Sequence, residues 1–138
     1  METYSQFKTR QQSAFEHFKG TFYAFSDKQY DEGLEKLGIT REEATNKLTT
    51  FGGGGFILKD RLNELEKLAY NFELERQNAF KDDNFLINAL VYELINHEYC
   101  ITYDEQDALD ALGLSVEDIP SHIMIDATRE ALKKSEDC

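Results

Sequence analysis

Three aspartates follow one another at three-residue intervals in the C-terminal half of the sequence, at Asp104, Asp107 and Asp110. On a helix this spacing places the carboxylates on one side, opposite the apolar positions Leu109 and Leu112. General acid–base catalysis would require one carboxyl group to be desolvated, and no apolar neighbours in the sequence provide that. Solvated carboxylates in a row resemble instead the phosphates of a nucleic-acid backbone. The pattern therefore favours a binding surface over an active site.

These aspartates belong to a segment with an extreme charge. Residues 82–128 contain 11 acidic residues and no Lys or Arg, whereas residues 1–81 hold 13 acids and 12 bases. The whole chain of 138 residues has a formal net charge of −12. Because like charges repel, such a segment is either a solvated face that aids solubility or a surface for a basic partner. The candidate partner-binding residues are Asp104, Glu105, Asp107, Asp110, Glu117 and Asp118.

Other residues that could bind a ligand or catalyse a reaction do not form a complete motif. The run from Gly52 to Gly55 could hold an anion on its backbone N–H groups, but it lacks the Lys and Ser or Thr of a phosphate loop. A turn or a close backbone approach is the favoured interpretation. His97 and Glu98 begin a zinc-protease motif, but Ile101 occupies the position of the second histidine. The sequence therefore predicts no enzyme, no metal site and no cofactor.

The composition bounds the class of protein. A chain of this length suits one domain, so a single domain over residues 1–138 is predicted, and its 41% of hydrophobic residues can form a core. The negative charge disfavours direct binding of nucleic acid. No apolar run reaches the ~20 residues of a membrane span, and the N-terminus lacks a signal-peptide pattern, which indicates a cytoplasmic protein. The two cysteines, Cys100 and Cys138, are expected to be reduced.

The elements that position the acidic residues are mainly helices, and the predicted fold is a compact, mainly α domain of about six helices. Only the segment 49–58, with four glycines between apolar residues, suits strands, so a small β-hairpin is predicted there. The segment 84–96 is apolar around most of its circumference and should form a central, buried helix. Periodicity, N-cap residues and glycine stops place six helices near 3–19, 27–37, 61–80, 84–96, 103–112 and 121–134, and a shorter one at 41–47.

Three stretches of the sequence, at 22–30, 52–57 and 96–114, resemble a family of small, acidic proteins of unknown function encoded on phages and mobile elements of gut bacteria. The resemblance covers almost the whole chain and carries no catalytic motif. Such elements encode inhibitors of host defence, among them anti-CRISPR proteins, some of which occupy the nucleic-acid or PAM-reading groove of the nuclease. The resemblance implies that the protein acts in the cytoplasm of a bacterial host cell.

Together these observations lead to the hypothesis of a non-enzymatic inhibitor of a host-defence nuclease. Its acidic face would bind the basic surface with which a CRISPR nuclease reads nucleic acid or the PAM. Neither direct nucleic-acid binding nor membrane binding is expected. The alternative is a structural or regulatory protein of a phage or mobile element, with a homo-oligomer allowed and no nuclease target, whose acidity serves solubility only. A small enzyme that uses the glycine run is the third class.

Overall fold

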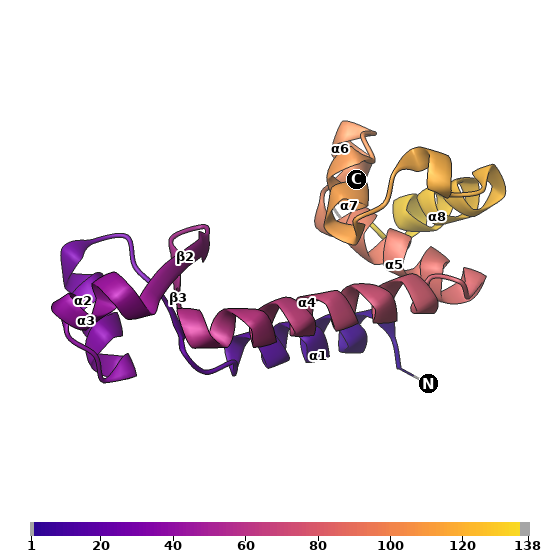
Figure 1. Cartoon of the computed structure of the whole chain (residues 1–138). Helices are drawn as coiled ribbons and strands as arrows, with labels where there is room; N and C mark the ends of the chain where they lie inside the picture. The colour runs from indigo at the N-terminus through magenta and orange to yellow at the C-terminus, as the bar shows by residue number, and fades with distance from the viewer. Residues whose placement is uncertain (1, 136–138) are drawn as a thin grey trace. The chain divides into compact units, whose positions relative to one another are not determined.

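The computed structural model describes residues 2–135, which form eight α-helices, one 3₁₀ turn and a small three-stranded antiparallel sheet (Figure 1). The prediction of a mainly helical fold is confirmed, with eight helices in these residues where about six were expected. The contacts within the chain divide it into two units, which are described separately. The sheet unit is Ser13–Glu73, and the helical unit is Met1–Gln12 with Leu74–Cys138. The boundaries fall inside α1 (Tyr4–Glu16) and α4 (Lys59–Ala79).

The helices of the sheet unit begin and end where local signals predict. The Ser26 hydroxyl accepts a hydrogen bond from the Gln29 N–H at the start of α2, and Gly38 ends that helix in the left-handed conformation, with φ 73°. Thr40 and Glu43 form a capping box at the start of α3. The elements of this unit, beside the ends of α1 and α4, are β1 (Thr21–Tyr23), α2 (Asp27–Leu37), α3 (Arg41–Lys47), β2 (Leu48–Gly52) and β3 (Gly55–Leu58).

The sheet confirms the predicted hairpin and adds a strand that the sequence did not indicate. β2 and β3 are antiparallel, and the glycines between them adopt positive φ angles in the turn. β1 pairs with the other edge of β3, so the strand order is β1-β3-β2. Confining strands to 49–58 was therefore wrong. The three residues of β1 form a strand because Phe22 lies opposite Phe56, a partner far away in the sequence.

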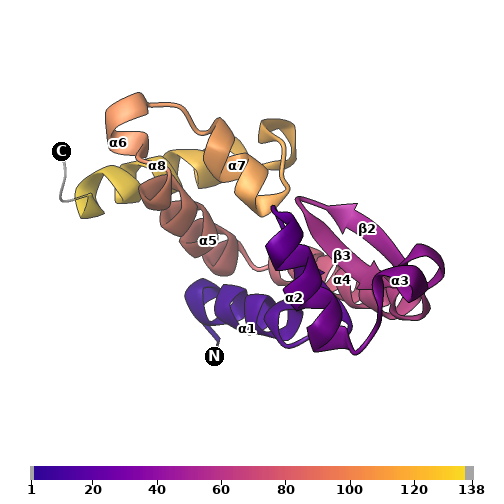
Figure 2. The same cartoon turned by 90° about the vertical axis from the view of Figure 1, so that its left-hand side faces the viewer.

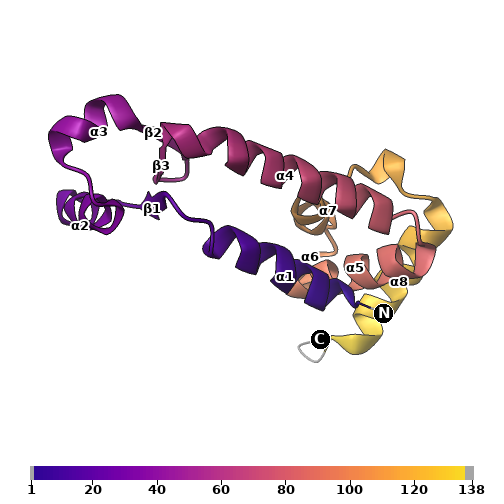
Figure 3. The same cartoon turned by 60° about the horizontal axis from the view of Figure 1, so that its bottom comes forward.

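The core of the sheet unit lies between the sheet and the two helices α2 and α3, which lie on the same side of the strands (Figure 3). The ring of Phe22 stacks on that of Phe56 at 5.2 Å between centroids, and Tyr30 of α2 meets both rings edge-on. Gly33 of α2 faces the Phe22 ring, where a Cβ atom would have no room. This glycine therefore allows the helix to approach the sheet closely.

The helical unit is built around α5 (Asp83–Asn96), as predicted for the most apolar segment. Both α7 (Gln106–Leu112) and α8 (Ser121–Lys134) pack against α5 (Figure 2). Leu90 and Leu94 are fully buried in this core. The short helix α6 (Tyr99–Thr102) was not predicted, and a 3₁₀ turn, η1 (Val116–Asp118), links α7 to α8.

Candidate functional site

The predicted acidic residues are brought together in the helical unit, on the segment from α6 to the 3₁₀ turn. We call the set Asp104, Glu105, Asp107, Asp110, Glu117 and Asp118 the acidic surface. Five of the six are exposed, and Glu105 is half-buried. Opposite them, Leu109 and Leu112 are 1% exposed and lie in the core against α5. α7 thus separates the carboxylates from the apolar side chains as its sequence predicts.

Local hydrogen bonds hold several of these carboxylates in place. Asp104 Oδ1 accepts the backbone N–H of Gln106 at 2.9 Å, and Asp110 Oδ1 accepts the Gln106 side-chain amide at 2.7 Å. Asp118 Oδ2 accepts the hydroxyl of Ser115 at 2.8 Å. The predicted start of the helix near residue 103 was wrong: α7 begins at Gln106, so Asp104 precedes the helix and orders its first turn.

The acidic surface carries its charge without neutralising partners. Among residues 2–135, no Lys, Arg or His side chain lies within ion-pair distance of any of the six carboxylates. Exposed, unpaired carboxylates lose little on meeting a cation from another molecule, because no internal ion pair has to be broken. This surface can therefore accept hydrogen bonds from Arg or Lys of a partner.

One acidic residue of the same charged segment does not belong to the surface. Glu93 is 0% exposed in α5, and its carboxylate forms an ion pair with Lys8 at 2.7 Å, while His97 Nε2 lies 3.7 Å away. Burial, followed by the negative charge of Glu93, raises the pKa of the neighbouring Tyr4 phenol above its usual value. The ion pair of Glu93 with Lys8 thus joins α5 to α1, and Glu93 has a structural role. The number of acids in the segment does not distinguish this buried residue from the exposed ones.

A small apolar projection precedes the acidic surface and was missed by the sequence analysis. We call Tyr99, Ile101 and Tyr103 the α6 tip. Ile101 is 61% exposed and Tyr103 66% exposed, while the Tyr99 ring packs edge-on to that of Tyr103 at 5.8 Å. Burial and the neighbouring Glu105 carboxylate raise the pKa of Tyr99 above its usual value. Exposed aromatic and aliphatic side chains of this kind are typical anchors of protein interfaces.

The backbone around the α6 tip is strained. Glu98 and Tyr103, which bracket α6, adopt left-handed φ angles of 58° and 54°, although neither is glycine. Such angles cost about 1 kcal/mol per residue, and they are found preferentially where function requires a particular backbone shape. Contacts with the rest of the fold are needed to impose these left-handed angles, so no local sequence pattern predicts them.

Replacing Glu98 by glycine is expected to raise the free energy of unfolding by about 0.5–1 kcal/mol, because glycine adopts the left-handed angle without strain. The Glu98 side chain is exposed and caps nothing, so its loss costs little. Chemical denaturation measures the change. The matched control is Glu105→Gly. Glu105 has an ordinary φ of −87°, so glycine relieves no strain there and this variant should be less stable than the parent. A loss of stability in Glu98→Gly equal to that of the control would contradict the strain argument.

The structure also bears on metal binding, membrane-spanning helices and the cysteines. Within residues 2–135, no group of three or more His, Cys, Asp or Glu side chains could hold a metal ion. Nor does any helix of this range combine the length and apolar character needed to cross a membrane. The expectation of a reduced Cys100 was wrong, because this buried residue of α6 is disulfide-bonded. Cys138 lies outside the described residues.

The fold and the site together define a mostly helical protein with a small antiparallel sheet and an unpaired acidic surface. The chain belongs to the DUF7659 family, a family of unknown function whose model matches residues 3–135. No curated protein and no solved structure gives a significant match.

Proposed function

We propose that this protein is a non-enzymatic inhibitor that binds the basic, nucleic-acid-binding surface of a partner protein. The contact is made by the acidic surface together with the α6 tip. The observation that carries this proposal is the adjacency of unpaired carboxylates and exposed apolar anchors, since Asp104 and Glu105 directly follow Tyr103 in the chain.

The two parts of this surface have different roles in binding. The carboxylates attract a basic groove over a distance of about one Debye length, ~10 Å at 0.1 M salt, and so accelerate association. The apolar side chains Ile101 and Tyr103 lose contact with water in the complex and slow its dissociation. A surface with charge alone would bind weakly and lose its affinity in salt, and the α6 tip supplies the part that salt does not weaken.

In its most specific form, the proposal names a CRISPR nuclease as the partner. Such nucleases hold nucleic acid in positively charged channels and read the PAM with arginines that donate two parallel hydrogen bonds. Carboxylates fixed by local bonds, as Asp104 and Asp110 are, can accept the same donors. The resemblance of the sequence to proteins of phages and mobile elements supports this partner and an action in the cytoplasm of the bacterial host cell.

The triple substitution Asp104→Asn, Asp107→Asn and Asp110→Asn tests the proposal. Asparagine keeps the side-chain oxygen that accepts the local hydrogen bonds, so the free energy of unfolding should change by no more than about 1 kcal/mol. The association rate with a purified, guide-loaded CRISPR nuclease should fall about tenfold at low salt, and its dependence on salt should become shallower. Biolayer interferometry at several salt concentrations and cleavage of a target plasmid measure these effects.

The matched control removes three charges from elsewhere. Glu32, Glu35 and Glu66 are exposed acids of the sheet unit without ion-pair partners, and their replacement by glutamine should leave association and inhibition unchanged. Equal losses in the two triple variants would mean that only net charge matters and would contradict a defined binding surface. If the parent protein inhibits no nuclease in a panel from gut bacteria, the CRISPR partner is wrong.

One observation favours the alternative, a structural or regulatory protein that forms a homo-oligomer. None of the residues of α4 is buried, although its leucines recur at helical spacing, and Tyr70 remains 65% exposed. A half-exposed apolar helix can associate with a second copy of itself. Sedimentation equilibrium tests this oligomeric form of the alternative: a monomer would contradict it, whereas the inhibitor proposal does not require a dimer.

A further inference from the structure

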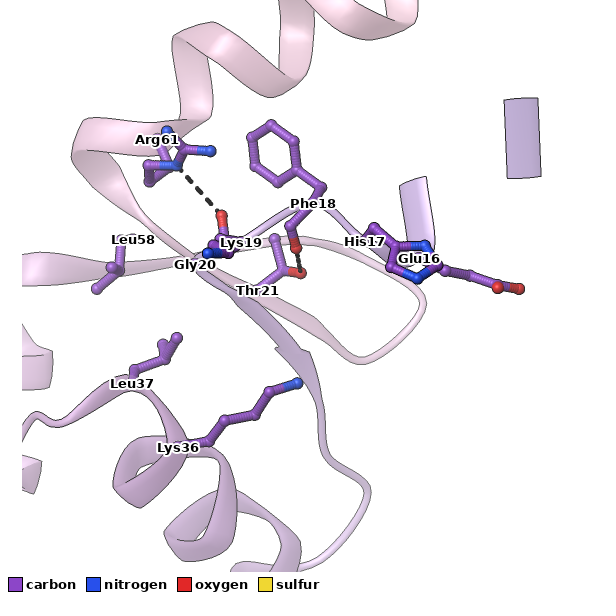
Figure 4. A pocket seen from close by; sticks show the side chains of 10 residues that line it. All are labelled: Glu16, His17, Phe18, Lys19, Gly20, Thr21, Lys36, Leu37, Leu58 and Arg61. Atoms are coloured by element: carbon purple, nitrogen blue, oxygen red, sulfur yellow. Dashed lines mark hydrogen bonds between the residues drawn. The ribbon is translucent and has the colours of Figure 1, made fainter. Parts of the chain in front are cut away.

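A second candidate site lies entirely within the sheet unit and differs from the acidic surface in charge. A pocket of about 650 Å³ opens between the end of α1, the first residues of β1, α2 and the start of α4 (Figure 4). Its size is within the range of pockets that bind small molecules. We call it the basic pocket; the lining residues that matter for binding are Glu16, Phe18, Lys19, Lys36, Leu37 and Arg61.

The charge of the basic pocket is opposite to that of the chain. Three cations line it together with a single acid, Glu16: Lys19 from the turn after α1, Lys36 from α2 and Arg61 from α4. The Glu16 side chain extends away from these three in Figure 4. In a chain with a formal net charge of −12, cations collected in one hollow create a local site that attracts anions.

Arg61 is held in position within this pocket. Its Nε donates to the backbone oxygen of Lys19 at 3.2 Å, its guanidinium lies 4.6 Å from the centre of the Phe18 ring, and it pairs with Glu64. Gly20, with φ 94°, lets the backbone approach Arg61, because a Cβ atom there would lie 2.9 Å from Arg61 Cγ. A fixed guanidinium loses little entropy when it binds an anion.

The two lysines provide the uncompensated charge. Neither Lys19 nor Lys36 has an ion-pair partner among the described residues, whereas the charge of Arg61 is partly balanced by Glu64. Figure 4 shows Lys36 reaching from α2 toward β1. Lys36 also lines a neighbouring hollow of about 500 Å³. Two acids, Glu16 and Glu32, line that hollow, so it is a poorer site for an anion than the basic pocket.

We propose that the basic pocket binds a small phosphate-bearing molecule with an apolar body. The phosphate is held by Lys19 and Lys36, with Arg61 as the fixed cation beside them. The apolar body contacts Phe18 and Leu37, which form part of the wall. This site is independent of the inhibitor function, because it uses no residue of the acidic surface or the α6 tip.

Titration of the full-length protein with phenyl phosphate, followed by ¹H–¹⁵N NMR, tests this site. Saturable shifts are expected at the amides of Lys19, Gly20 and Lys36, with weaker binding of inorganic phosphate because it lacks the apolar body. The double variant Lys19→Gln and Lys36→Gln should bind phenyl phosphate about tenfold more weakly. Both lysines are exposed, so the variant should fold normally.

The control variant is Lys28→Gln and Lys67→Gln, which removes two exposed lysines of the same unit that do not line the pocket. Its affinity for phenyl phosphate should stay within twofold of that of the parent. The proposal is overturned if sodium chloride at equal ionic strength causes the same shifts, or if both double variants lose affinity equally. Tighter binding of phenol than of phenyl phosphate would also overturn it, since the pocket would then be merely apolar.

Discussion

Replacing Lys8 by methionine should lower the free energy of unfolding by about 3 kcal/mol. Lys8 Nζ lies 2.7 Å from Glu93 Oε1 and 3.4 Å from Oε2, and the Glu93 side chain is fully buried. Methionine preserves the apolar stem of the lysine but leaves a buried carboxylate without its cation. Urea denaturation followed by circular dichroism measures the loss.

A second variant shows whether the loss comes from the charge. Adding Glu93→Gln to Lys8→Met removes the uncompensated carboxylate, and the double variant should recover at least half of the lost stability. The control is Lys47→Met, which breaks the exposed pair with Glu43 on α3 and should cost less than about 1 kcal/mol. If Lys8→Met costs no more than this control, the buried ion pair does not fasten α1 to α5.

Replacing Gly33 by alanine should lower the free energy of unfolding by about 2 kcal/mol, opposite in sign to the usual effect of this change in a helix. Alanine normally stabilises a helix interior by about 1 kcal/mol relative to glycine. At Gly33, however, the added Cβ would overlap Cδ2 of the Phe22 ring. The Phe22 ring cannot move away freely, because Phe56 stacks on one side and Tyr30 meets its edge. Overpacking of this kind costs about 1–3 kcal/mol.

Thermal unfolding of three variants isolates this clash. Phe22→Leu alone should destabilise the sheet unit, but combining it with Gly33→Ala should cost less than the sum of the two single changes, because the smaller side chain leaves room for the methyl group. Lys28→Ala, an exposed substitution on the same helix, should change stability by less than about 0.5 kcal/mol. A stabilising Gly33→Ala would contradict the close approach of α2 to the sheet.

The candidate site was predicted in part. The charge of residues 82–128 follows from counting, and the spacing of Asp107 and Asp110 relative to Leu109 correctly predicts which side of α7 is exposed. The same counting also included Glu93, which is buried, because a long apolar helix gives no sign that one acid on it has a distant cation partner. The α6 tip escaped prediction because its left-handed residues are Glu98 and Tyr103, and non-glycine residues do not signal positive φ.

The sequence by itself determined the elements whose ends are controlled by neighbours in the chain. The ends of α2 and the start of α3 follow from Ser26, Gly38 and Thr40, since caps act over three or four residues. Only the tertiary structure decided the features that join distant residues. β1 forms because Phe22 meets Phe56, and the basic pocket forms because the turn after α1, helix α2 and the start of α4 bring their cations together. Such contacts depend on which apolar surfaces bury one another, and that choice is made by the whole chain rather than by any local pattern.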